Sequence, residues 1–225
     1  MAERARRVLL LAALALTATT GCASRHLART VGAGNSEARV SIGGPLFSNL
    51  GAPIPLPNVA LGGRYGVADG WDVDGNVSLL GAAVGVAYLD PGVVKQLFVQ
   101  ERGAALSASA RANLFIGSSE GLAVRVYPEV GLHGELPLGP SAKVFGGGTA
   151  WISFTPPEGK SPVMVTPYLG ASWRFGEHPR GGPELSLQLG WVSPWMDSSS
   201  VVAWEPKGHG AVTALLGLSV PFGGG

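Results

Sequence analysis

LAVRVYPEVGLHGE (residues 122–135) alternates apolar and polar side chains along its length. Its first face is apolar and carries Leu122, Val124, Val126, Pro128, Val130 and Leu132. Its second face is mostly polar and carries Ala123, Arg125, Tyr127, Glu129, Gly131, His133 and Glu135. A period of two residues predicts a β-strand with an apolar environment on one side and a polar one on the other. Pro128 cannot donate to a strand ladder, so it predicts a bulge or an edge-like break.

The same alternation recurs on both sides of this stretch. It is clear in residues 163–175, 184–191 and 212–222, and weaker in residues 142–154, where Gly146, Gly147 and Gly148 suggest a bend or a close backbone approach. Further candidate strands are residues 38–43, 57–67, 71–81 and 104–117. Glycine-containing turns such as 68–70 separate them. Nine candidate strands imply an all-β sandwich or barrel, and we predict an antiparallel up-and-down β-barrel of about 8–10 strands.

One segment departs from the period of two. Asp90 and Pro91 have the character of a helix N-cap and a first helical residue. Val93, Val94, Leu97 and Phe98 then fall on one helical stripe. We therefore predict one short helix near residues 91–99, either packed as a connector over the end of the sheet or placed at a barrel mouth.

Nine strands conflict with the even number that single-chain membrane barrels have. Either residues 38–43 stay outside the barrel and eight strands remain, or a tenth strand is hidden in residues 82–89. With eight strands, the N-terminus would lie on the periplasmic side, residues 136–140 would form a tight periplasmic turn, and the long loop at 193–208 would face outward.

Alternation alone does not decide which face lies inside. In a lipocalin-like soluble barrel the apolar face lines the core, whereas in a membrane barrel it meets lipid. Long strands and aromatic residues at strand ends (Phe154, Trp173, Phe175, Trp191 and Phe222) favour the membrane barrel. Its lumen would then hold a mixed-charge network made of Arg111, Arg125, Glu129, His133, Glu135, Arg174 and Glu184.

The N-terminus has the pattern of an export signal. Arg4, Arg6 and Arg7 precede an apolar run of roughly ten residues, too short for a transmembrane helix. Small residues then lead to Cys22, the single cysteine of the 225-residue chain. A lone cysteine cannot form an internal disulfide, and a thioether-linked lipid would account for it.

Thr19-Thr20-Gly21-Cys22 resembles the lipobox of bacterial lipoproteins, although Thr19 departs from the usual Leu. Together with the strands, the chain is similar to outer-membrane β-barrel lipoproteins. This resemblance implies a signal peptide (1–21), a lipidated N-terminus and flexible tether (22–37), and a barrel domain (38–225). It also implies acyl chains such as palmitate on Cys22 and, because Ala23 is not Asp, an outer-membrane location in a Gram-negative bacterium.

The composition gives little support for other classes of function. A net charge of +1 gives no argument for nucleic-acid binding. The four histidines show no metal-ligand spacing, and 146–149 lacks the remaining residues of a phosphate-binding loop, so we expect no cofactor. We predict a structural or envelope-associated barrel without catalysis, in contact with membrane lipid and with protein partners unknown. The alternatives are a tethered soluble barrel that binds a hydrophobic ligand and a lipid-modifying enzyme that uses His133.

Overall fold

The computed structural model describes residues 28–47, 54–55, 58–79, 86–101, 103–117, 123–156, 161–176, 182–197 and 208–222. The predicted signal peptide and Cys22 lie outside these ranges. Within them, no helix is long and apolar enough to cross a bilayer. The strands are β1 (Ser36–Phe47), β2 (Ile54–Pro55), β3 (Asn58–Ala68), β4 (Trp71–Ser78), β5 (Val86–Leu89), β6 (Gly92–Val99), β7 (Ala105–Gly117), β8 (Ala123–Pro137), β9 (Ala142–Ile152), β10 (Val163–Arg174), β11 (Glu184–Asp197) and β12 (His209–Phe222).

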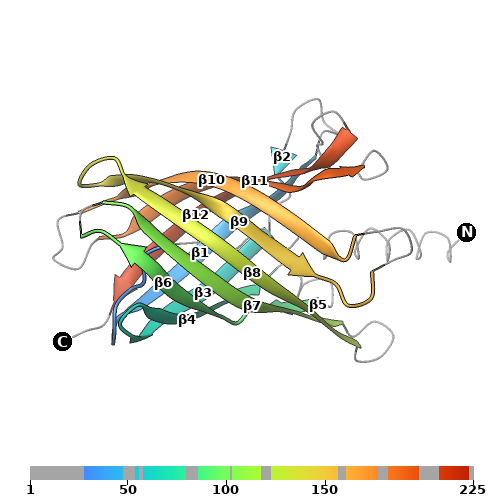
Figure 1. Cartoon of the computed structure of the whole chain (residues 1–225), viewed down its shortest axis with the longest axis horizontal. Helices are drawn as coiled ribbons and strands as arrows, with labels where there is room; N and C mark the ends of the chain where they lie inside the picture. The colour runs from blue at the N-terminus through green and yellow to red at the C-terminus, as the bar shows by residue number, and fades with distance from the viewer. Residues whose placement is uncertain are drawn as a thin grey trace, which may run out of the picture.

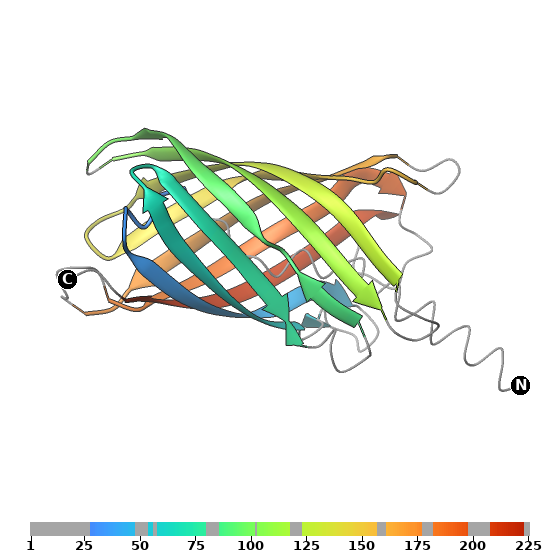
Figure 2. The same cartoon turned by 90° about the horizontal axis from the view of Figure 1, so that it is seen from below.

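The strands form one antiparallel sheet that closes on itself (Figures 1 and 2). Strand β1 pairs with both β3 and β12, so that Ser36 lies opposite Tyr65 on one side and Phe222 on the other. Strands β5 and β6 share one position, because each pairs with β4 and β7. The barrel therefore has 10 strands, with β2 as a short extra strand on β1.

This architecture confirms the predicted fold class and settles the strand number. Residues 38–43 do not stay outside the barrel, because they belong to β1. The tenth strand position comes instead from β5, within the 82–89 segment, continued by β6. Pro128 lies where β8 loses one neighbour, since pairing with β9 begins only at Glu129. The predicted edge-like break is present at that point.

The helix predicted near residues 91–99 is wrong, because this segment forms β6. Pro91 interrupts the strand between β5 and β6 rather than starting a helix. A register shift between Gln96 and Phe98 then turns Leu97 and Phe98 to the same exposed side. A β-bulge of this kind places consecutive side chains on one face and imitates a helical stripe.

The polarity of the barrel is inverted relative to a soluble protein. In the described part of the chain, 31 large hydrophobic side chains are exposed, whereas 24 polar or charged side chains are buried. In β11, for example, Leu187 and Leu189 point outward while Ser186 and Gln188 are buried. The lipocalin-like alternative required an apolar interior, and the described residues form a polar one.

The two ends of the barrel differ. We call the end where β1 begins and β12 ends the terminal mouth, and the opposite end the far mouth. At the terminal mouth the exposed aromatic residues are Tyr65, Trp71, Phe98, Trp173, Phe175 and Phe222, and towards the far mouth they are Phe154, Trp191 and Trp195. Trp173 lies opposite Leu185, ten residues before Trp195 on β11. Ten residues tilted by about 40–45° cover roughly 25 Å of the barrel axis, the height of the apolar band in membrane barrels.

The segment before β1 folds into the terminal mouth. Residues 28–35, which we call the N-terminal strap, begin at Ala28, which is fully buried. The Val31 amide donates a hydrogen bond to Asp72 Oδ2 at 2.9 Å, and Arg29 Nε donates one to Glu135 Oε1 at 2.6 Å. These contacts differ from the flexible tether predicted for residues 22–37, whose last two residues also belong to β1.

Candidate functional site: the charged interior of the barrel

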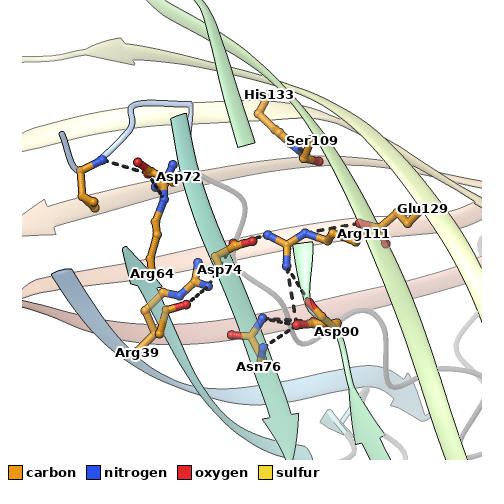
Figure 3. A network of polar contacts seen from close by, with 12 residues as sticks. Arg39, Arg64, Asp72, Asp74, Asn76, Asp90, Ser109, Arg111, Glu129 and His133 are labelled. Carbon is orange, nitrogen blue, oxygen red and sulfur yellow. Dashed lines mark hydrogen bonds and ion pairs between the residues drawn. The ribbon is translucent and has the colours of Figure 1, made fainter. Parts of the chain in front are cut away.

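Arg111 of β7 is the centre of a buried ion-pair network in the middle of the lumen (Figure 3). Its guanidinium group contacts Asp74 of β4, and it lies 3.6 Å from Asp90 Oδ1 and 3.8 Å from Glu129 Oε1. Asp74 also accepts from Arg39 of β1 at 3.2 Å. The network thus connects strands that are far apart in the sequence and lie on different sides of the lumen.

A second ion pair lies closer to the terminal mouth. Arg64 Nε of β3 is 2.5 Å from Asp72 Oδ2 of β4, and both side chains are buried. Asp72 is the residue that also accepts from the Val31 amide of the strap. A buried carboxylate needs such partners, because an unpaired charge in a dry interior is costly. The strap therefore adds one backbone hydrogen bond to the Asp72 carboxylate of this pair.

Glycines on the inner face make room for these long side chains. A Cβ atom on Gly92 of β6 would lie 2.5 Å from Arg111 Cγ. A Cβ atom on Gly131 would lie 2.6 Å from His133 Cε1 and 2.7 Å from Ser109 Oγ. On Gly147, in the glycine run of β9, it would meet the backbone of β8 and the Tyr168 hydroxyl. The close approach predicted for that run is present.

His133 forms a buried chain with Ser109 and Tyr168. Its Nε2 lies 2.7 Å from Ser109 Oγ, and its Nδ1 lies 2.5 Å from the Tyr168 hydroxyl. A serine next to a histidine is the starting point of nucleophilic catalysis. Here, however, the third group is a phenol rather than the carboxylate of a hydrolase triad. All three residues are at most 7% exposed, so a substrate has no access to Ser109 in this arrangement.

Aromatic side chains fill the lumen towards the far mouth. Tyr88, Phe115 and Trp151 form a buried cluster against which Tyr127 packs. The ring centroids of Tyr88 and Phe115 are 4.9 Å apart, and Tyr127 stacks on Trp151 at 6.2 Å. The Trp151 indole donates to Glu129, which connects this cluster to the charged network.

The predicted lumen residues occupy three places. Arg111, Glu129 and His133 lie in the buried middle of the lumen. Glu135, Glu184 and Arg174 lie at the terminal mouth, where Lys143 joins them. Arg125 is exposed near the start of β8, at the far mouth, and is separate from both groups.

Sequence reasoning missed several partners in the network. The predicted lumen network did not include Arg39, Arg64, Asp72 and Asp74, and Asp90 was interpreted as a helix N-cap. The alternation in β1 and β3 would have identified the two arginines as inward-facing. Ser109 was not predicted as a partner of His133, because it lies on β7 and not on the same strand as His133. The register of β7 and β8, with Ser107 opposite His133, brings Ser109 within reach.

In the middle of the lumen, the charged side chains are paired with one another. No group of three or more metal-ligating side chains is found among the residues that the structure describes. Each acid of the middle network faces an arginine, and the aromatic cluster occupies the space beyond it. This arrangement suits a stabilising network better than a reaction centre.

Comparisons with known proteins give structural similarity only. The sequence matches no protein-family model, and no curated protein matches it. A Pseudomonas aeruginosa FadL homologue has a TM-score of 0.36 at 12% identity, over 76% of this chain and 53% of the other. Pseudomonas aeruginosa OccK11 has a TM-score of 0.32 at 8% identity, over 83% and 63% of the two chains. The CymD monoaromatic hydrocarbon channel has a TM-score of 0.34 at 8% identity, over 86% and 89%.

The chain thus spans a little more than half of the FadL homologue and less than two thirds of OccK11. With TM-scores this low, none of the three supports a functional argument.

Proposed function

We propose that the protein is a lipid-anchored β-barrel that spans the bacterial outer membrane and has a structural, envelope-associated role without catalysis. The observation that carries this proposal is the inverted polarity of the barrel, with apolar rows outside and a charged network inside. In water, exposed rows such as Leu187 and Leu189 would favour association, whereas in a bilayer they are solvated by lipid. The two exposed aromatic bands lie at a separation that suits the two bilayer interfaces.

The loops support one orientation. Only Asp69 and Gly70 connect β3 to β4 at the terminal mouth, whereas residues 198–208 connect β11 to β12 at the far mouth. Membrane barrels have short periplasmic turns and longer extracellular loops. We therefore assign the terminal mouth to the periplasm and the far mouth to the outside.

The filled lumen supports a structural role over transport. The ion-pair network around Arg111 occupies its middle, and the cluster around Phe115 occupies the side towards the far mouth. The strap covers part of the terminal mouth and is held there by Arg29 and Val31. A solute would have to displace all three layers, so we infer that the resting barrel does not conduct.

The proposed lipid anchor is compatible with this orientation. Cys22 precedes the buried Ala28 by six residues, which reach about 20 Å when fully extended. Acyl chains on Cys22 would then enter the leaflet on the side of the terminal mouth. Several acyl chains together make a lasting anchor.

The decisive experiment removes residues 1–22 and asks whether the remaining chain folds without detergent. We expect it to fold only in detergent or lipid, because its exposed rows need an apolar solvent. A soluble, monomeric and folded product in plain buffer would contradict the membrane-spanning barrel and favour a tethered soluble one.

A further inference from the structure

The terminal mouth contains a pocket that the network in the middle of the lumen does not use. Its volume is about 640 Å³, within the range of sites that bind small molecules. The strap, the turn between β8 and β9, and the facing ends of β10 and β11 line it. Its charged side chains are Arg29, Lys143, Arg174, Glu101, Glu135 and Glu184.

Arg29 and Glu135 form a short ion pair of 2.6 Å in this pocket, whereas the ion pairs of Lys143 and Arg174 are longer. Lys143 Nζ is shared between Glu135 Oε2 at 3.4 Å and Glu184 Oε1 at 3.2 Å. Arg174 Nη2 is 3.4 Å from Glu184 Oε2, and its side chain is 46% exposed. Charge-assisted hydrogen bonds of optimal strength are about 2.7–2.9 Å long. Lys143 and Arg174 can therefore exchange their present partners for groups of a ligand.

Ser172 provides an independent sign of an unfilled site. It lines the pocket from β10, opposite Lys143 of β9, and only 1% of its surface is exposed. Its hydroxyl has no hydrogen-bond partner among the residues that the structure describes. A buried hydroxyl without a partner is costly, so a ligand group that accepts or donates a hydrogen bond at Ser172 would be favoured.

We propose that this pocket binds a short zwitterionic peptide of the kind found in the stem peptides of the bacterial cell wall. Three cationic and three anionic side chains line the pocket, so it favours neither a pure anion nor a pure cation. A ligand carboxylate bonds to Arg174 and Lys143, and a ligand ammonium group bonds to Glu184. A peptide amide or hydroxyl group supplies the partner of Ser172. This inference rests on the proposed function, which opens the terminal mouth to the periplasm, where such peptides are attached to the cell wall.

The test uses the full mature chain in detergent micelles and the tetrapeptide L-Ala–γ-D-Glu–meso-diaminopimelate–D-Ala, titrated by isothermal calorimetry. We expect saturable one-to-one binding that disappears when the amines of the peptide are acetylated and its carboxylates amidated. R174Q should weaken binding at least tenfold, and S172A should weaken it a few-fold. R125Q removes the same group at the far mouth and should leave binding unchanged.

Each contrary result is informative. Equal binding of the neutralised peptide, or equal weakening by R125Q and R174Q, overturns the proposal. So does a folded, detergent-embedded chain that shows no binding of the tetrapeptide, and that result leaves the membrane-spanning barrel intact. Heat-dependent gel mobility reports whether each variant is folded, and Arg174 is exposed enough for its substitution to be tolerated.

Discussion

Arg111 on β7 reaches Asp74 on β4 across an intervening strand, because the residue between them is glycine. Asp74 lies opposite Gly92 of β6, and Gly92 in turn lies opposite Arg111. The three residues form one row on the inner face, and the Arg111 side chain passes over the empty position of Gly92. The ion pair between Arg111 and Asp74 thus depends on glycine at position 92, because a larger residue would occupy the path of the Arg111 side chain.

This relationship predicts that G92A destabilises the barrel. The new methyl group would lie 2.5 Å from Arg111 Cγ and 3.0 Å from the Ala110 carbonyl oxygen, so the arginine must move away from Asp74. Overpacking of this kind costs about 1–3 kcal/mol in the free energy of unfolding. Urea titration of the chain folded in lipid vesicles measures the loss.

The control is G148A on β9, three strands away from β6. A Cβ atom there meets its nearest atoms at 3.8 and 4.0 Å, which is ordinary contact. It should leave stability close to that of the original chain. If G92A and G148A lose the same free energy of unfolding, the space that Gly92 leaves for Arg111 does not contribute to stability.

We expect the Asp74 carboxylate to contribute more to the free energy of unfolding than either one of its two ion pairs, with Arg39 or with Arg111, contributes by itself. D74N removes the charge that faces both Arg39 and Arg111 and leaves two buried cations. Breaking a buried ion pair by removing one partner costs about 3–5 kcal/mol. The double variant D74N/R111M removes Arg111 together with the carboxylate that it contacts, so its destabilisation should be smaller than the sum of the losses of the two single variants. Urea unfolding of all four proteins gives this coupling, and additive losses would argue against a direct interaction.

The strands could be predicted from the sequence because the two faces of each strand lie in different environments. Val124, Val126 and Val130 are exposed outside, whereas Glu129 and His133 are buried inside, so the period of two is nearly uninterrupted along β8. The period of two residues is interrupted where the strand itself is irregular. In β6 the bulge near Gln96 shifts the register, and the resulting pattern resembles a helix.

The network was only partly predictable from the sequence. Alternation identifies which side chains of a strand point into the barrel, but it does not identify which residues of neighbouring strands lie opposite one another. It separates Arg111 and Glu129 from the outward-facing apolar side chains. It does not reveal that Arg111 meets Asp74, since that contact depends on the register across β6. The strap was also missed, because residues 28–35 have no period and their order comes from contacts to Asp72 and Glu135.

The proposed anchor predicts that C22S abolishes incorporation of a palmitate analogue. Serine has the shape of cysteine but cannot form the thioether that carries the lipid. Labelling of cells with an alkyne-palmitate, followed by purification of the chain, measures the incorporation. Because the barrel itself would span the membrane, C22S should still fractionate with the outer membrane. Persistent labelling of C22S would exclude Cys22 as the acylated residue.

If the outward-facing apolar side chains contact lipid, a charged residue placed among them should strongly destabilise the barrel. Leu189 is 52% exposed and lies near the centre of β11, opposite Leu169 and Ala214 of the flanking strands. In a membrane barrel, arginine at the bilayer midplane costs about 2–4 kcal/mol, because the charge is taken out of water. L189R should therefore lower the free energy of unfolding of the chain in vesicles by that amount. L138R, in the turn between β8 and β9, replaces an equally apolar and more exposed residue beyond the strand ends, at 67% exposure, and should change stability little. If both substitutions have the same small effect, the face that carries Leu189 is in contact with water, and the proposed membrane-spanning barrel is wrong.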